Sequence, residues 1–227
     1  MHSQTQATRE IVIGSNSTIW HCLSANRSLS ERFAVAISHR DVPSFEFHPH
    51  DRVWIFSYSH DWSDNEALLR RIASAGVVNP IYVSTATTNV LGVTRCYTYP
   101  RVKSLAENFA LETLTAKVLT IGVMYRNASE LPSGRTAATS YEELAEFMMH
   151  PHWPQDNGRR MMLFKLVERP FGSRFERAVF ASYSRAMALF SWKPCLLRPL
   201  DLVLRGMGYR WYGYVFLSNR LWSSTIS

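Results

Sequence analysis

Short, unbroken apolar runs recur through the first half of the chain, and most of them end in turn-forming residues. Strands of a parallel sheet have this pattern, because helices cover both faces of such a sheet and bury nearly every side chain. The runs predict six strands, over residues 10–14, 33–37, 44–47, 52–56, 79–84 and 117–123.

Segments with helical spacing separate several of these runs. Ile19, Leu23 and Leu29 mark the inner face of a first helix, and residues 65–75 and 101–115 form two longer amphipathic segments. Strands that alternate with helices predict an α/β fold with a Rossmann-like, doubly wound parallel sheet. Sheets of this type bind ligands at the carboxyl ends of their strands.

The pattern changes after residue 126. Ser-Tyr-Glu-Glu at residues 140–143 resembles a capping box and predicts a helix, residues 161–167 predict a strand, and helical spacing returns over residues 175–192 and 199–207. We therefore predict two regions. Residues 1–126 form a Rossmann-like nucleotide-binding core, and residues 127–227 form a small, mainly helical C-terminal region that packs on the core as a substrate lid or an oligomerisation region.

The net charge of +7 is concentrated toward the C-terminal end. Residues 159–227 hold twelve of the 25 Lys and Arg residues but only three of the 18 acids, and they are rich in aromatic residues. A basic, aromatic segment can contact a membrane surface, an anionic substrate or nucleic acid. A solvated cationic face over an aromatic core explains the composition equally well. No nucleic-acid-binding module is recognisable, so we expect no nucleic acid partner.

Cysteine usage and the N-terminal sequence indicate the compartment. Cys22, Cys96 and Cys195 give no disulfide framework, which favours a reducing environment. Residues 1–10 are polar and do not resemble a secretory leader. The sequence contains no run of about eighteen apolar residues, the length that a membrane-spanning helix needs. We therefore expect a cytoplasmic protein, either free or peripheral to a membrane.

Two His-Pro-His triplets, at residues 48–50 and 150–152, contain a residue type that ligates metals. Proline makes each triplet rigid, and no fourth ligand is evident. We therefore expect no metal site.

Tyr99 and Lys103 lie four residues apart at the start of a predicted helix. This spacing places both side chains on one face. A phenol with a pKa of about 10 is a poor acid–base catalyst at neutral pH, but a nearby ammonium group favours the phenolate and lowers its pKa. The pair therefore predicts a general acid/base. The same spacing is also common in exposed pairs at helix starts.

Two hydroxyl groups precede Tyr99 by about fifteen residues. Ser84 and Thr85 end a predicted strand and so reach the carboxyl edge of the sheet. A hydroxyl at this edge can hold a substrate carbonyl or alcohol against the tyrosine. Glu107, four residues after Lys103, is placed for an ordinary helix ion pair.

Residues 82–92, Tyr-Val-Ser-Thr-Ala-Thr-Thr-Asn-Val-Leu-Gly, are followed by Tyr-Pro-Arg-Val-Lys at residues 99–103. Over residues 9–126 the chain resembles the extended short-chain dehydrogenase/reductase family of nucleotide-sugar epimerases, dehydratases and reductases. The resemblance implies that Tyr99 is the general acid/base and that Lys103 lowers its pKa and binds the nicotinamide ribose. It also implies that Thr85, with Ser84 beside it, is the hydroxyl partner.

The family's glycine motif aligns with residues 14–20, Gly-Ser-Asn-Ser-Thr-Ile-Trp. Ser17 and Trp20 replace the second and third glycines, and we expect Trp20 either to push the helix away or to turn outward, which puts dinucleotide affinity in doubt. The amides at the start of the helix would still favour an anion. The resemblance implies that the loop binds the cofactor through Gly14, Ser15, Asn16, Ser17, Thr18 and Ile19.

The end of the second predicted strand bears on the choice of cofactor. Ser38, His39 and Arg40 stand where the family has an acid that receives the ribose hydroxyls of NAD, and the first acid is Asp41. Serine and arginine suit a 2′-phosphate, so we predict NADP (or NAD) as the cofactor, with Arg40 as a ligand. An ordinary surface arginine explains Arg40 equally well.

These residues favour an NAD(P)-dependent oxidoreductase or epimerase that acts on a sugar nucleotide or a related polar carbonyl compound, in surface-polysaccharide biosynthesis. An anionic substrate suits the basic C-terminal region, and a second subunit could complete the site in a homodimer. The alternative is a non-catalytic binding or regulatory protein on the same fold, favoured by Ser17, Trp20 and the short chain. The presence of Thr85, Tyr99 and Lys103 favours the enzyme.

Overall fold

A computed structural model describes residues 9–48, 50–153, 158–207 and 213–225; the polar segment at residues 1–8 lies outside this description. The chain forms two compact units, and each contains residues from both sides of position 126. The first unit comprises Met1–Ser84, Leu105–Thr120 and Tyr141–Met162, and the second comprises Thr85–Ser104, Ile121–Ser140 and Leu163–Ser227.

A six-stranded sheet is the framework of the first unit. Its strands are, in spatial order, β2 (Val35–Ile37), β1 (Glu10–Ile13), β3 (Arg52–Ile55), β4 (Ile81–Thr85), β5 (Lys117–Ile121) and β8 (Arg160–Leu163). β1 pairs in parallel with β2 and β3, and β3 pairs in parallel with β4. Nearly every residue of β1, β3 and β4 is buried, as expected for a sheet that is covered on both faces.

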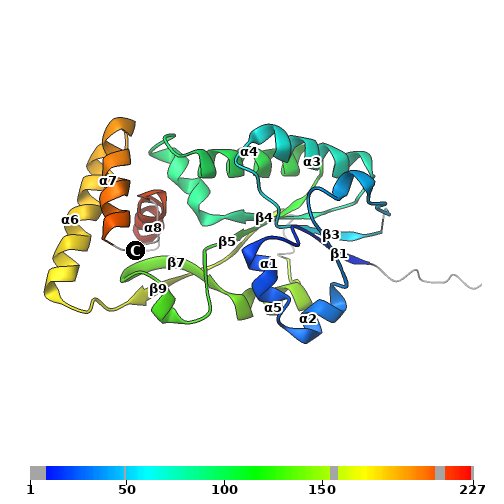
Figure 1. The fold of residues 1–227 in the computed structure, drawn as a ribbon, viewed down its shortest axis with the longest axis horizontal. Coiled ribbons are helices and arrows are strands. Elements are labelled where there is room, and N and C mark those ends of the chain that lie inside the picture. Colours follow the sequence, from blue (N-terminus) through cyan, green and yellow to red (C-terminus); the bar gives the residue numbers. More distant parts are fainter. Residues whose placement is uncertain (1–8, 49, 154–157, 208–212, 226–227) are drawn as a thin grey trace, which may run out of the picture. The chain divides into compact units, whose positions relative to one another are not determined.

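Helices cover both faces of this sheet. In Figure 1, α3 (Trp62–Ser74) lies on one face, and α1 (Thr18–Leu23), α2 (Arg27–Arg32) and α5 (Tyr141–Met149) lie on the other. α4 (Thr98–Thr113) connects β4 to β5. The predicted fold class, an α/β Rossmann-like doubly wound sheet, is confirmed.

Two predicted elements of the first unit differ from the structure. The single helix predicted across residues 19–29 is two short helices, because Asn26 caps α2 and its side chain accepts a hydrogen bond from the Leu29 amide (3.2 Å). The strand predicted over residues 44–47 is wrong. Its start belongs to a 3-10 helix, η1 (Val42–Ser44), in which Pro43 lacks the N–H that a strand ladder needs.

The second unit has its own sheet and three C-terminal helices. β7 (Gly134–Ser140) is the central strand of this sheet, with β6 (Val123–Tyr125) parallel to it and β9 (Lys165–Arg169) antiparallel. Two short 3-10 helices, η2 (Ala86–Gly92) and η3 (Ala128–Glu130), also belong to this unit. The helices are α6 (Arg174–Phe190), α7 (Pro194–Gly206) and α8 (Gly213–Thr225).

The helical C-terminal region is confirmed, and the structure adds two elements that the sequence analysis misses, α8 and β7. The strand predicted over residues 161–167 breaks at Phe164 into β8 and β9, which belong to different sheets. α6, α7 and α8 lie side by side (Figure 1) around a core that includes Tyr183, Met187, Leu197 and Phe216. Among the described residues, no helix combines the length and the apolar character needed to cross a membrane.

Candidate active site

Tyr99 and Lys103 lie one turn apart on α4, in the second unit. α4 begins at Thr98, so Tyr99 stands in its first turn and shares a helix face with Lys103. Lys103 is only 6% exposed, whereas Tyr99 is partly accessible. Of the two residues, Tyr99 is therefore the one that retains some access to solvent.

Thr85 forms a side-chain hydrogen bond with Tyr99. Thr85 ends β4 and caps η2, where its Oγ1 accepts a hydrogen bond from the Thr87 amide (3.3 Å) and lies 3.1 Å from the Thr87 hydroxyl. The cap fixes the Thr85 hydroxyl at the end of the strand. The structure thus brings together two residues that the sequence nominates, while their catalytic roles stay a prediction.

Burial changes the pKa of both members of the Tyr99–Lys103 pair. It raises the pKa of the Tyr99 phenol, and the hydrogen bond with Thr85 acts in the opposite direction with a smaller effect. It lowers the pKa of the Lys103 ammonium group to about 8. Lys103 therefore loses its proton at a lower pH than an ordinary lysine does. The expected lowering of the Tyr99 pKa by Lys103 stays a prediction, because burial dominates in this structure.

Ser84 has a different partner. Its hydroxyl donates a 2.6 Å hydrogen bond to Oε2 of Glu107, and Arg160 forms an ion pair with Oε1 of the same carboxylate. Glu107 is 5% exposed, so these bonds satisfy a buried charge. Successive strand residues point to opposite faces, which explains why Ser84 and Thr85 have different partners. A catalytic role for Ser84 stays a prediction.

Tyr214, which the sequence analysis misses, stacks on Tyr99. The two ring centroids are 5.5 Å apart and the ring planes are inclined by 23°. The Tyr97 ring meets Tyr214 edge-on, with a centroid distance of 5.3 Å and an angle of 71°. The run Tyr-Val-Phe-Leu at residues 214–217, directly after Gly213, is the sequence signal from which α8 and its tyrosine could have been found.

Hydrogen bonds tie α8 to η2, the segment that follows Thr85. Ser218 Oγ lies 2.9 Å from the Ala86 carbonyl oxygen and 2.6 Å from Oδ1 of Asn89. The Trp222 indole N–H donates to the same Ala86 oxygen (3.3 Å). The C-terminal helix is therefore held against the segment that carries Thr85, and it forms part of the surroundings of Tyr99.

The turn after β1 requires glycine at residue 14. Gly14 has a φ of +112°, and a Cβ atom there would lie 2.9 Å from the Ser57 amide nitrogen and 3.1 Å from the Phe56 carbonyl carbon. Its own amide donates to the Ile37 carbonyl (2.8 Å). The first unit therefore has the tight strand-to-helix turn that a nucleotide-binding loop needs.

Ser17 closes this turn and starts α1. Its amide donates to the Gly14 carbonyl (2.9 Å), and its hydroxyl accepts a hydrogen bond from the Trp20 amide (3.1 Å). Serine at the position of the second glycine thus acts as a helix N-cap. The Ser17 hydroxyl is engaged by its own helix in this structure.

The other loop residues differ in accessibility. The Ser15 amide donates to the Ile37 carbonyl (3.1 Å), which ties it to β2. Asn16 and Thr18 are exposed, and Ile19 is partly exposed. Asn16, Thr18 and the first amides of α1 therefore fit a pyrophosphate, whereas Ser15 and Ser17 mainly shape the turn.

Trp20 lies in the core of the first unit. It is 5% exposed and packs against Phe33 and Phe56, with ring centroids 6.0 and 6.5 Å away. The outward orientation considered in the sequence analysis is therefore wrong, because aromatic neighbours surround the indole. The third glycine of the motif is replaced by a core residue.

Arg40 lies three residues beyond the end of β2. Its side chain is exposed, and its amide donates to the Ser38 hydroxyl (3.2 Å). The Asp41 carboxylate accepts a hydrogen bond from the Ser38 amide (3.3 Å), so it helps to form this turn. The position agrees with the expected place of a cofactor ligand, and that role stays a prediction.

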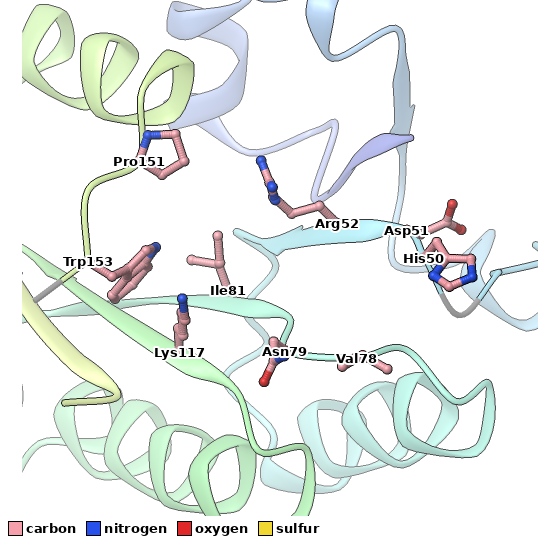
Figure 2. Close-up of a pocket in the computed structure, with 9 residues that line it drawn as sticks. All are labelled: His50, Asp51, Arg52, Val78, Asn79, Ile81, Lys117, Pro151 and Trp153. Atoms are coloured by element: carbon pink, nitrogen blue, oxygen red, sulfur yellow. The ribbon is translucent and has the colours of Figure 1, made fainter. Parts of the chain in front are cut away.

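A pocket of about 410 Å³ lies at the amino ends of β3, β4 and β5 (Figure 2). The Lys117 ammonium group stands 5.1 Å above the Trp153 ring, and Figure 2 shows His50 and Asp51 on the other side of the pocket. Asp51 accepts hydrogen bonds of 2.9 and 2.6 Å from Arg9. These polar groups do not converge, so we assign this pocket no ligand. Within the described part of the chain, no group of three or more His, Cys, Asp or Glu residues could hold a metal ion.

No protein-family model matches the sequence, and no curated protein matches it. Solved structures do match the fold. UDP-N-acetylglucosamine 4-epimerase from Bacillus cereus is 11% identical, with a TM-score of 0.51 over 78% of this chain and 85% of that chain. The dTDP-4-dehydrorhamnose reductase from Bacillus anthracis str. Ames, solved in complex with NADP, is 11% identical, with a TM-score of 0.51 over 79% and 82%.

A third similar structure is MoeE5 in complex with UDP-glucuronic acid and NAD. It is 13% identical, with a TM-score of 0.50 over 70% of this chain and 77% of that chain. Identities this low establish similarity of fold. The fold that the resemblance implies is thereby confirmed.

Proposed function

We propose that the protein is an NAD(P)-dependent oxidoreductase or epimerase that acts on a sugar nucleotide or a related polar carbonyl compound. The observation that carries this proposal is the hydrogen bond between Thr85 and Tyr99, with the buried Lys103 one turn further along α4. A strand-end hydroxyl, a phenol and a lysine are the groups that proton transfer at a carbonyl or alcohol oxygen requires.

The chain's own residues handle the oxygen of the substrate and its proton. The Thr85 hydroxyl, fixed by its cap, holds the substrate oxygen against Tyr99. Tyr99 gives a proton to this oxygen or takes one from it. Lys103, with a pKa of about 8, holds the positive charge that favours the phenolate when it is protonated.

Gly14, the residues that follow it up to Ile19, and Arg40, all in the first unit, would hold the cofactor. When bound, the nicotinamide supplies or accepts the hydride. The tight turn at Gly14 and the exposed Asn16 and Thr18 fit this group. The exposed Arg40 suits the 2′-phosphate of NADP.

The substrate class is inferred from similar folds and from charge. The similar structures include an epimerase and a reductase of nucleotide sugars, and MoeE5 was solved with UDP-glucuronic acid. Residues 159–227 carry twelve Lys and Arg side chains against three acids, which suits an anionic substrate. A role in surface-polysaccharide biosynthesis is consistent with this substrate class.

A second candidate is a non-catalytic protein that binds a nucleotide or a sugar nucleotide on the same fold. Two observations favour it: Trp20 fills the core where the motif has a glycine, and Tyr214 covers part of the Tyr99 ring. Such a protein would bind its ligand without turnover.

Calorimetric titration of the purified chain with NADPH and with NADH tests the proposal. We expect saturable binding, with Arg40→Ala weakening the binding of NADPH and leaving that of NADH unchanged. Tyr99→Phe should bind the cofactor normally and lose turnover of a sugar-nucleotide substrate. If neither nucleotide binds at millimolar concentration, the proposal of an NAD(P)-dependent enzyme is contradicted. The non-catalytic binding protein is then the better explanation.

A further inference from the structure

We propose that the outer face of α7 docks on a membrane surface that contains anionic lipid. Side chains along this face are apolar and solvent-exposed, and we call them the apolar stripe: Trp192, Leu196, Leu202, Val203 and Met207, which are between 38% and 68% exposed. Leu196, Val203 and Met207, spaced i, i+7 and i+11, lie on one side of α7 and its C-cap. Leu202 lies about 100° around the helix from Val203 and is also exposed, and Trp192 stands in the turn just before the helix. This inference is independent of the proposed enzyme activity.

α7 does not need this face for its own packing. Leu197, which is 1% exposed, and the partly buried Leu200 supply that packing, in the core formed with α6 and α8. Asp201 accepts a hydrogen bond from the Gly213 amide (2.6 Å). A helix that is apolar on both sides is normally covered on both, so the exposed side requires an apolar environment.

The charges around the apolar stripe favour an anionic partner surface. Residues 174–207 contain six cations and two acids. Both acids accept hydrogen bonds from within the unit. Asp201 accepts one from the Gly213 amide, and Glu176 accepts one from the Ser133 hydroxyl and one from the Gly172 amide (both 2.6 Å). The cations are Arg174, Arg177, Arg185, Lys193, Arg198 and Arg205.

Two of these cations lie beside Leu202, one turn before it and one turn after it. Arg198 and Arg205 are exposed and lie on α7 itself, seven residues and thus two turns apart. Lys193 stands 4.3 Å from the centre of the Trp192 ring. An apolar face with a tryptophan and flanking basic residues is typical of helices that lie in the interface of an anionic bilayer.

A second copy of the chain fits this face less well. In a symmetric dimer the same patch would meet itself, so the cations Arg198 and Arg205 of one copy would approach the cations of the other. The length of α7 also excludes a spanning orientation, because thirteen residues of helix extend about 20 Å and a bilayer core is about 30 Å thick. α7 would therefore lie in the plane of the membrane surface.

Flotation of the full chain with lipid vesicles tests the proposal. We expect binding to vesicles of phosphatidylcholine mixed with phosphatidylglycerol, and at least tenfold weaker binding to phosphatidylcholine alone. The double variant Leu202→Glu/Val203→Glu should lose at least tenfold in binding to the mixed vesicles. Both side chains are more than half exposed, so the fold should persist, and circular dichroism checks this.

Two further variants separate the contributions. Val78→Glu changes a residue that is 56% exposed elsewhere on the chain, and it should bind the mixed vesicles as the wild type does. Arg198→Glu/Arg205→Glu should remove most of the dependence on phosphatidylglycerol. The proposal is overturned if the wild type fails to bind the mixed vesicles, or if the Leu202/Val203 variant binds as well as the wild type. The proposal is also overturned if the wild type is a dimer that does not bind vesicles and that only Leu202→Glu/Val203→Glu dissociates. The face would then contact a second copy of the chain.

Discussion

Tyr99 and Tyr214 stack with their ring centroids 5.5 Å apart and their planes inclined by 23°. This contact joins the residue that the sequence nominates as a general acid/base to a helix that the sequence analysis misses. Burial is the largest influence on the Tyr99 pKa, and the stacked Tyr214 ring covers part of the Tyr99 ring. The C-terminal helix therefore influences how readily Tyr99 loses its proton.

Removal of the Tyr214 ring should lower the pKa of Tyr99. In Tyr214→Ala, water reaches the phenol, the desolvation that raises its pKa is reduced, and the pKa moves toward its ordinary value of about 10. Tyr214→Phe keeps the stacked ring and serves as the control. Ultraviolet titration of tyrosinate, each variant compared with the same variant carrying Tyr99→Phe, isolates Tyr99. Equal Tyr99 titrations in the two Tyr214 variants would contradict the prediction.

Replacement of Thr85 by valine removes a hydroxyl and keeps the shape of the side chain. Because the Thr85 hydrogen bond lowers the Tyr99 pKa, Thr85→Val should move the alkaline limb of the pH–rate profile to higher pH. If Thr85 holds the substrate oxygen, kcat should also fall on the order of 10²-fold. Thr85→Ser should retain most of the activity. A valine variant with the wild-type rate and pH profile would exclude Thr85 from the site.

Lys103 should make the stability of the protein depend on pH. Burial lowers its folded-state pKa to about 8 from an ordinary value of 10.5. Between these values the unfolded chain binds more protons, so the free energy of unfolding rises as the pH rises from about 8 to 10.5. As the pH falls, this gain is lost across the same window, and the loss is complete at about pH 8. Below that pH the full cost of the buried cation is present, at most about 3 kcal/mol.

Lys103→Met should therefore stabilise the protein below about pH 8, and its advantage should shrink as the pH rises toward 10.5. Urea unfolding at several pH values in this window measures the difference. Lys165→Met, which changes an exposed lysine, is the control and should show little pH dependence. An advantage of Lys103→Met that stays constant across the window would show that the lysine keeps its ordinary pKa in the folded state.

The sequence predicts the parallel sheet well because its strands are buried on both faces. Residues 10–13 and 52–55 are nearly continuous apolar runs, and no other element pattern competes with them. The strand expected at residues 44–47 is not formed. Its two phenylalanines alternate with polar residues as in a strand, but the neighbouring Pro43 favours the 3-10 turn that the structure has.

The candidate site is predictable only where its residues are close in sequence. Tyr99 and Lys103 share one helix, and Thr85 ends the preceding strand, so spacing and strand–helix order connect them. Tyr214 lies more than a hundred residues later, and no local pattern indicates that it stacks on Tyr99. From the sequence, Trp20 is expected to push the helix away or to turn outward, because its neighbours in the fold are not visible in the local sequence. In the structure, packing against Phe33 places it in the core.

Gly14 should tolerate no side chain. Gly14→Ala has to adopt a φ of +112° and places a Cβ atom 2.9 Å from the Ser57 nitrogen, so we expect a loss of about 1–3 kcal/mol in the free energy of unfolding. Gly76→Ala is the matched control, because its φ is also positive (+68°) but nothing lies within 4 Å of the new atom. Urea unfolding should show the larger loss at residue 14. Equal losses would attribute the effect to the backbone angle alone.

Trp20→Gly, which restores the third glycine of the dinucleotide motif, should weaken the protein rather than improve it. The indole is 5% exposed and packs between Phe33 and Phe56, so its removal leaves a cavity that costs about 3–5 kcal/mol. Trp192→Gly removes an indole that is 68% exposed and should cost much less. Urea unfolding compares the two variants, and calorimetry with NADPH measures their affinity while they remain folded. A Trp20→Gly variant that is as stable as the wild type and binds NADPH more tightly would identify Trp20 as an obstruction in the cofactor loop. The non-catalytic alternative would then account better for a tryptophan at this position.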